Sequence, residues 1–226
     1  TEEETVTTGD NDPPTYTDNS PTTGTTGDSF TFDISAEDNI EVTNVSVYWD
    51  HGSFSDWFFL ADDGDGTFSG MVTLDHDLSS MTYTLRVNDS SDNYVESSLI
   101  TVTVTDNDDP EYDNIEWDPE DPITGTVLVS VEWSDNIGFS TIMLQYRLDN
   151  VSGYTNLTTY DQDGDIYNFT VTIPSTCDHF YFNVSAIDTS ANQVTSSTYY
   201  SKVNLPQFAT PTANPSMPAT GDIVNI

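Results

Sequence analysis

Hydrophobic and polar residues alternate with a period of two along most of this chain, which places successive side chains on opposite faces of a strand. No segment shows helical spacing. The alternation predicts strands at residues 29–35, 41–49, 56–61, 67–74, 81–88 and 95–105, and again at 126–133, 139–147, 154–160, 166–173, 179–187 and 194–203. Turn residues separate these strands. Short, regularly punctuated strands predict an all-β fold of tandem immunoglobulin-like β-sandwiches with a terminal extra strand.

The same blocks of sequence occur twice and in the same order. The triplet Asp-Asn-Ile at 38–40 returns at 135–137, an offset of 135 − 38 = 97. The triplet Asp-Gly-Asp at 63–65 returns at 163–165, an offset of 163 − 63 = 100, and Asp89 returns as Asp188, an offset of 188 − 89 = 99. Several ordered blocks at nearly one spacing indicate an internal duplication.

The duplication divides the chain into four segments. We expect residues 1–12 to be the end strand and linker of a preceding repeat, 13–107 and 108–204 to be two immunoglobulin-like repeats, and 205–226 to be a linker followed by the first strand of a further repeat or a donor strand. That last strand matches the strand that opens each repeat. It therefore opens a further repeat, or it is a donor strand that adds to the sheet of another copy through Ile223, Val224 and Ile226. A flexible tail is the alternative.

The charge balance limits the partners. The chain has 39 acidic residues against three basic ones and a formal net charge of -36. Nucleic acids and anionic membranes need clustered Lys and Arg, so we exclude both. No apolar run approaches the roughly 20 residues that span a bilayer. The single cysteine, Cys177, rules out an intrachain disulfide. Such a chain suits surroundings rich in cations.

Two runs resemble a known group. The run PTTGTTGDSFTFDISAEDNIEVTNVSVYW resembles the opening of immunoglobulin-like repeats in archaeal cell-surface proteins, and YNFTVTIPSTCDHFYFNVSAIDTSANQ is similar to their closing half. The chain departs from the group at Asp92 and Ala191, where Gly is usual in a turn. The resemblance implies an extracellular, cell-surface location. It does not separate filament, sheath, S-layer, stalk and adhesin.

An acidic linker stands between the repeats. The run VTVTDNDDP, ending at Pro110, resembles the calcium-binding linker of cadherins. In a sandwich of this type the linker approaches the loops after the second and the penultimate strands, so its carboxylates should meet those of the loops. Calcium binds six to eight oxygen ligands. The alternative is that Asp and Asn only make turns. The predicted calcium ligands are Asp10, Asp12, Asp38 and Asp89 in repeat one, and Asp106, Asp108, Asp135 and Asp188 in repeat two.

A second acidic motif, with Asp-Gly pairs, is the run Asp-Asp-Gly-Asp-Gly at 62–66 and Asp-Gln-Asp-Gly-Asp at 161–165. It resembles the start of a calcium loop, but the closing glutamate is missing. Asp-Gly is the usual two-residue hairpin turn, which is the better interpretation.

Six Asn-X-Ser/Thr sequons are candidate N-glycosylation sites. Four alternate with inward hydrophobic residues and so point outward, although outward polar residues are expected on any sandwich. The six are Asn44, Asn88, Asn150, Asn156, Asn168 and Asn183.

Catalysis finds no support in the sequence. The histidines His51, His76 and His179 are scattered, and no basic residue near Cys177 would activate its thiol. We therefore predict a non-enzymatic, extracellular structural module of a cell-surface filament, sheath, S-layer or stalk. Other copies of the chain would be its head-to-tail partners. The alternative is an adhesin or a carbohydrate-binding accessory module, for which Trp57 or Trp117 would supply an aromatic platform.

Overall fold

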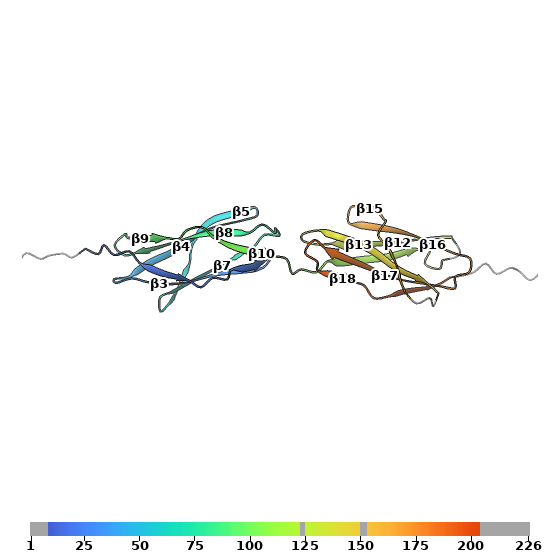
Figure 1. Ribbon diagram of the computed structural model, residues 1–226, viewed down its shortest axis with the longest axis horizontal. Coiled ribbons are helices and arrows are strands. Elements are labelled where there is room, and N and C mark those ends of the chain that lie inside the picture. The colour runs from blue at the N-terminus through green and yellow to red at the C-terminus, as the bar shows by residue number, and fades with distance from the viewer. Residues whose placement is uncertain (1–8, 123–124, 150–152, 204–226) are drawn as a thin grey trace, which may run out of the picture. The chain divides into compact units, whose positions relative to one another are not determined.

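The computed structural model describes residues 9–122, 125–149 and 153–203. These residues form β-strands and no helix, as the alternation predicts (Figure 1). Consequently they include no helix that is long and apolar enough to cross a membrane.

The first repeat contributes two sheets. One has the order β1-β3-β7-β6, and the other has the order β2-β10-β8-β4-β5, with β9 also paired to β8. Neighbours are antiparallel except for β2 and β10, which run parallel. The strands are β1 (Thr15–Asp18), β2 (Thr23–Thr25), β3 (Ser29–Glu37), β4 (Val42–His51), β5 (Phe54–Phe59), β6 (Ala61–Gly64), β7 (Thr67–Thr73), β8 (Met81–Asp89), β9 (Tyr94–Glu96) and β10 (Ile100–Thr105).

The second repeat follows the same plan. One sheet has the order β11-β12-β16-β15, and the other has the order β14-β13-β17-β18, with β19 also paired to β17. No sheet of the described residues mixes strands from the two repeats. The strands are β11 (Glu111–Asp118), β12 (Gly125–Ser134), β13 (Phe139–Leu148), β14 (Thr155–Leu157), β15 (Asp161–Asp163), β16 (Ile166–Ile173), β17 (His179–Asp188), β18 (Gln193–Thr195) and β19 (Tyr199–Lys202).

Alternate residues of the long strands form a core between the two sheets of each repeat. In β3 the burial alternates strictly, with Phe30, Phe32 and Ile34 buried between exposed polar neighbours. In the second repeat, Phe180 and Phe182 of β17 are fully buried in the same way. Burial of a side chain of this size stabilises a fold by roughly 1.5–3 kcal/mol. These residues therefore fix the register of their strands, because a one-residue slip would expose the whole set.

The structure corrects the predicted strand pattern at both ends of each repeat. Residues 95–105 form two strands, β9 and β10, separated at Ser97. The Ser97 hydroxyl accepts the Leu85 N–H at 2.9 Å and so replaces a ladder bond there. Residues 194–203 are divided in the same way, into β18 and β19.

The structure also places strands before the ones that were predicted to open each repeat. The predicted opening strands, at residues 29–35 and 126–133, are β3 and β12. The true first strands are the edge strands β1 and β11, in which no residue is fully buried. An edge strand of this kind has little hydrophobic alternation, so the sequence pattern does not reveal it. The edge strands β2, β6 and β15 were not predicted either, because they too lack a hydrophobic alternation.

By the contacts among its residues, the described chain divides into two compact units. The first comprises the residues up to Asp113 together with Trp133–Met143 and Ser185–Ser196. The second comprises Asn114–Glu132, Leu144–Val184 and the residues from Ser197. The loops at one end of the second repeat thus belong to the same unit as the linker that precedes them.

Candidate metal centres

One aspartate closes the loop that follows the penultimate long strand of each repeat. The Asp89 carboxylate accepts the backbone N–H groups of Ser91 and Asn93, each at 2.8 Å, and the side-chain amide of Asn93 at 2.7 Å. Asp188 makes the same bonds to Ser190 and Asn192, at 2.8, 2.8 and 2.7 Å. Both aspartates are buried, with exposed fractions of 3% and 1%. Each aspartate therefore stabilises the conformation of its loop, whether or not it also binds a cation.

A second aspartate of each repeat lies in the loop after β3 or β12. The Asp38 carboxylate accepts the N–H of Ile40 at 2.8 Å, and the Asp135 carboxylate accepts the N–H of Ile137 at 3.0 Å. These are local turns closed by the side chain itself. Both loops reach the end of the sandwich at which the chain enters the repeat.

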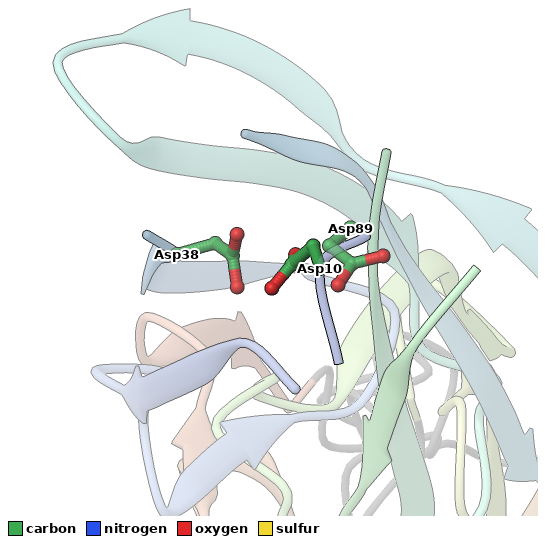
Figure 2. Close-up of side chains that lie close together, drawn as sticks. All are labelled: Asp10, Asp38 and Asp89. Carbon is green, nitrogen blue, oxygen red and sulfur yellow. The ribbon is translucent and has the colours of Figure 1, made fainter. Parts of the chain in front are cut away.

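In the first repeat the incoming segment completes a group of three carboxylates. Asp10, Asp38 and Asp89 each place one oxygen within 4.8 Å of the others, and Figure 2 shows the three side chains together. Asp10 also accepts the side-chain amide of Asn39 at 3.2 Å. Three segments that lie far apart in the sequence thus meet as the duplication predicted.

The electrostatics of this group favour a bound cation. Burial raises the pKa of Asp89, but the hydrogen bonds from Asn93 and Ser91 together outweigh it and hold the pKa below its usual value. The carboxylate is therefore ionised at neutral pH, close to two others. One oxygen of Asp10, Oδ2, is buried without a hydrogen-bond donor among the described residues. A buried charged oxygen with no donor is costly, and a metal ion removes that cost.

In the second repeat the linker carboxylate Asp106 is the centre of the corresponding group. Asp106 is 9% exposed and accepts the Thr26 hydroxyl at 2.8 Å and the Asn136 amide at 3.0 Å. Burial raises its pKa, whereas the bonds from Asn136 and Thr26, with further contacts that include Asp188, bring the pKa below its usual value. The Asn136 amide also donates to Asp108 at 2.8 Å. These linker and loop residues all belong to the first compact unit.

Asp135 is partly buried and lies near two other carboxylates, Asp188 and Asp106. Burial raises its pKa; the bonds from Gly138 and Ile137 oppose this, and the charges of Asp188 and Asp106 raise the pKa further. Its Oδ2 is buried without a donor among the described residues, as is Oδ1 of Asn136. Among the described residues, the cluster thus presents two buried oxygens with no hydrogen-bond donor, close to the Asp106 carboxylate, whose pKa is lowered.

The two repeats also present the same surface hollow beside these loops. In the first, Asp12, Glu37, Asp38 and Asn39 are among the residues that line a hollow of about 360 Å³. In the second, a hollow of about 500 Å³ is lined by Asp108, Asp109, Pro110, Glu111, Ser134, Asp135 and Asn136. Such clusters of carboxylate, amide and backbone oxygens are the ligands that calcium and other hard cations prefer.

The predicted ligands are not equally well placed. Asp12 is exposed and lines the hollow without joining the group of three. The Asp108 carboxylate accepts the Asn136 amide, and the Asp108 backbone N–H donates to Asp106 at 3.3 Å. Sequence reasoning left out the four asparagines Asn39, Asn93, Asn136 and Asn192, whose amides bond the carboxylates. The signal was present, because each asparagine recurs with its neighbouring aspartate in both repeats.

The remaining predicted sites have distinct environments. The sequons Asn44, Asn88, Asn156 and Asn168 lie on strands and are partly or fully exposed, and Asn183 on β17 is partly buried, with its Oδ1 lacking a partner among the described residues. The Asn88 amide donates to Asn44 at 2.7 Å. Asn150 and the strand-addition residues Ile223, Val224 and Ile226 lie outside the described residues.

The acidic hairpins are turns, as predicted. Asp65 and Gly66 link β6 to β7 and both have positive φ, of 53° and 83°, which is the geometry that a two-residue hairpin turn requires. The turn between β15 and β16 contains Gly164, with φ of 62°. The carboxylates of both hairpins are exposed and apart from the clusters described above.

Two large aromatic side chains of the edge strand β5 are exposed to solvent. Trp57 is 52% exposed and Phe59 is 71% exposed, while Phe58 packs against the core. Together with Ser46, Arg86 and Asn88 they line a hollow of about 370 Å³. This face is a candidate site for a ligand with flat apolar surfaces, such as a sugar.

His51 and Cys177 both lie in buried environments. His51 is buried, with its Nε2 3.1 Å from the carbonyl oxygens of Asp77 and Ser79. Burial raises the pKa of the Cys177 thiol, which disfavours the nucleophilic thiolate.

Comparisons with known proteins find similarity only to solved structures, and only at low identity. No protein-family model and no curated protein sequence matches the chain. Among solved structures, the titin domains Z1Z2 in complex with telethonin are 14% identical, with a TM-score of 0.40, over 88% of this chain and 98% of that one. Fibronectin(III)-like modules of Clostridium thermocellum CbhA are 16% identical, with a TM-score of 0.32, over 84% and 94%. A 1.5-MDa bacterial ice-binding adhesin is 11% identical, with a TM-score of 0.37, over 87% and 66%.

Identities this low leave function to be argued from the residues of the chain itself. The sheet orders and buried alternation establish tandem immunoglobulin-like β-sandwiches.

Proposed function

We propose that this chain is a non-enzymatic structural module of an extracellular cell-surface assembly, in which calcium stiffens the start of each repeat. The observation that carries the proposal is the recurrence of one arrangement. In the first repeat the incoming segment, the loop after β3 and the loop after β8 bring Asp10, Asp38 and Asp89 together. In the second repeat Asp106, Asp135 and Asp188 occupy the same positions and lie close enough to affect one another's pKa. A cation held by three segments would fix the direction in which the chain enters the sandwich.

The net charge of -36 supports the same role. Self-repulsion of this size opposes compaction unless cations screen or bind the carboxylates. Extracellular fluids supply calcium at concentrations that weak sites of this class can use, roughly 10⁻⁴–10⁻³ M. We therefore propose that the protein works outside the cell as a surface repeat of the archaeal type.

The proposed assembly is a filament, sheath, S-layer or stalk in which copies associate head to tail. The strand expected at the end of the segment 205–226 would pair, through Ile223, Val224 and Ile226, with a sheet edge of the next module. A contact of this heterologous kind does not close on itself and therefore extends indefinitely. N-linked glycans on the sequons, most readily at the exposed Asn156, would cover the outward faces.

A second candidate is an adhesin or a carbohydrate-binding accessory module. The exposure of Trp57 and Phe59 favours it, because aromatic rings on a sheet face offer surfaces on which sugars stack. A glycan-array signal that is lost in Trp57→Ala would support this candidate. Tyr94→Ala, which removes another exposed ring of the first repeat, is the matched control.

Electron microscopy of the purified chain in calcium tests the main proposal. We expect polymers for the full chain and loss of polymers after deletion of residues 206–226. Polymers that persist after the deletion would contradict strand addition. A full chain that stays monomeric in calcium at all concentrations would contradict the structural role.

A further inference from the structure

Basic side chains are scarce in this protein, and their pairing is uneven. Only Arg86, Arg147 and Lys202 carry a permanent positive charge, against 39 acidic residues. Arg86 has a carboxylate partner, Glu96, at 3.6 Å. Arg147 and Lys202 have none within salt-bridge distance among the described residues. In a chain so rich in carboxylates, two unpaired cations stand out.

These two cations share one face of the second repeat. Arg147 on β13 lies with its guanidinium carbon 3.8 Å from the ring centre of Tyr181 on β17. Tyr181 is directly opposite Tyr200 on β19, and their ring centres are 5.1 Å apart. Lys202 lies opposite His179 in the same ladder, and the His179 ring stacks on Tyr200 at 5.6 Å. We call Arg147, His179, Tyr181, Tyr200 and Lys202 the cationic face.

The cationic face is open to contact. Tyr200 is 51% exposed and Lys202 is exposed. The nearby carboxylate of Asp149 is engaged elsewhere, because its Oδ1 accepts the backbone N–H groups of Asp178 and His179 at 2.6 and 3.0 Å. Arg147 donates a hydrogen bond to the Asp149 backbone carbonyl at 3.0 Å, and its guanidinium carbon also lies 5.6 Å from the ring centre of Tyr154. It has no carboxylate partner among the described residues.

We propose that the cationic face is a contact surface for a second copy of this chain, which it binds through carboxylates on the partner's surface. Tyr and Arg are the residue types enriched where protein interfaces carry most of their binding energy. A row of rings on a sheet suits a protein surface rather than an enclosed small ligand. A second copy presents carboxylates over its surface, so it is the partner whose charge complements Arg147 and Lys202. The inference rests on the proposed self-association and names a surface through which it occurs.

Sedimentation velocity tests this contact with three forms of the full chain: wild type, R147Q/K202Q and R86Q. The R86Q variant is the matched control, because Arg86 also covers a tyrosine, Tyr94 at 4.0 Å, but already has Glu96 as its partner. At an ionic strength of about 0.1 M, where charge pairs act over roughly 10 Å, we expect the wild type and R86Q to associate alike. We expect R147Q/K202Q to associate at least about tenfold more weakly.

Because the guanidinium of Arg147 also packs on Tyr181, the single variant K202Q, at an exposed position, separates association from folding. It should melt like the wild type and still associate more weakly. Equal association of all forms would overturn the inference and leave the proposed self-association intact. A wild type that is monomeric throughout would overturn both, even if it bound an anionic polysaccharide.

Discussion

Ala191 and its counterpart Asp92 occupy the left-handed backbone region, with φ of 76° and 68°, in the loops that Asp188 and Asp89 close. A side chain with a Cβ costs roughly 1–2 kcal/mol in this region. The loops hold this conformation because the buried aspartate bonds both the second and the fourth residue after it. Local hydrogen bonding thus overrides the preference of the residue that stands in the turn.

Ala191→Gly should therefore stabilise the protein. Glycine adopts positive φ without steric cost, although its greater freedom in the unfolded chain offsets part of the gain. We expect an increase of about 0.5–1 kcal/mol in the free energy of unfolding, measured with urea. Ala36→Gly, in strand β3, is the control and should reduce stability. A loss of stability in Ala191→Gly would show that the loop needs alanine for another reason.

The residue scale also shows what the sequence reveals of the site. The recurrence of Asp38 and Asp89 as Asp135 and Asp188 predicts both acidic clusters before any coordinates. It does not reveal that Asp12 stays apart or that Asn136 bridges Asp106 to Asp108. Those facts depend on the path of the incoming segment and on side-chain rotamers, and a pattern of residue types contains neither.

At the scale of the element, buried strands were predictable and edge strands were not. β3, β8 and β16 carry strict alternation because one face of each is in the core. The edge strands β1 and β11 bury no residue fully, so their positions are set by pairing with β3 and β12 rather than by their own pattern. The break at Ser97 is likewise hidden, because a side-chain hydroxyl stands in for a backbone group.

Gly70 of β7 shows how closely the elements of the first repeat pack. A Cβ at this position would lie 2.6 Å from the ring of Phe58 and 2.8 Å from Leu60. Gly70→Ala should therefore push β5 away from β7 and lower stability by about 1–3 kcal/mol in urea unfolding, as overpacking does. Met71→Ala, at a neighbouring position that is 70% exposed, should change stability little. Equal effects of the two substitutions would mean that the core beside Gly70 can accommodate a methyl group without strain.

At the scale of the whole molecule, the net charge of -36 makes stability depend on cations. Calcium that binds the native state alone would raise the free energy of unfolding by about 2.7 kcal/mol at one hundred times its dissociation constant. We expect chelation to lower the melting temperature at fixed ionic strength, and magnesium to replace calcium poorly because it requires near-ideal octahedral geometry. A melting temperature that depends on ionic strength but not on calcium would mean that the aspartates of these clusters only stabilise turns.

Without a cation, Asp135 should give the protein a distinctive pH dependence. Its pKa is raised in the folded state, mainly by burial, so its favourable contribution is complete at low pH and is lost as the pH rises through the folded-state pKa. In chelator, the stability of Asp135→Asn relative to wild type should therefore be greatest at neutral pH and shrink on acidification. A difference that is independent of pH would exclude ionised Asp135 as its source.

Thermal unfolding of the wild type and Asp135→Asn, with calcium and with chelator at equal ionic strength, tests the central claim most directly. In chelator the variant should be as stable as the wild type or more so, because it removes an ionised group that is repelled by Asp188 and Asp106. In calcium the order should reverse, because the variant loses a ligand. Asp163→Asn, in an exposed hairpin, is the control and should follow the wild type in both. A wild type unaffected by calcium, with the variant less stable in both conditions, would contradict the account.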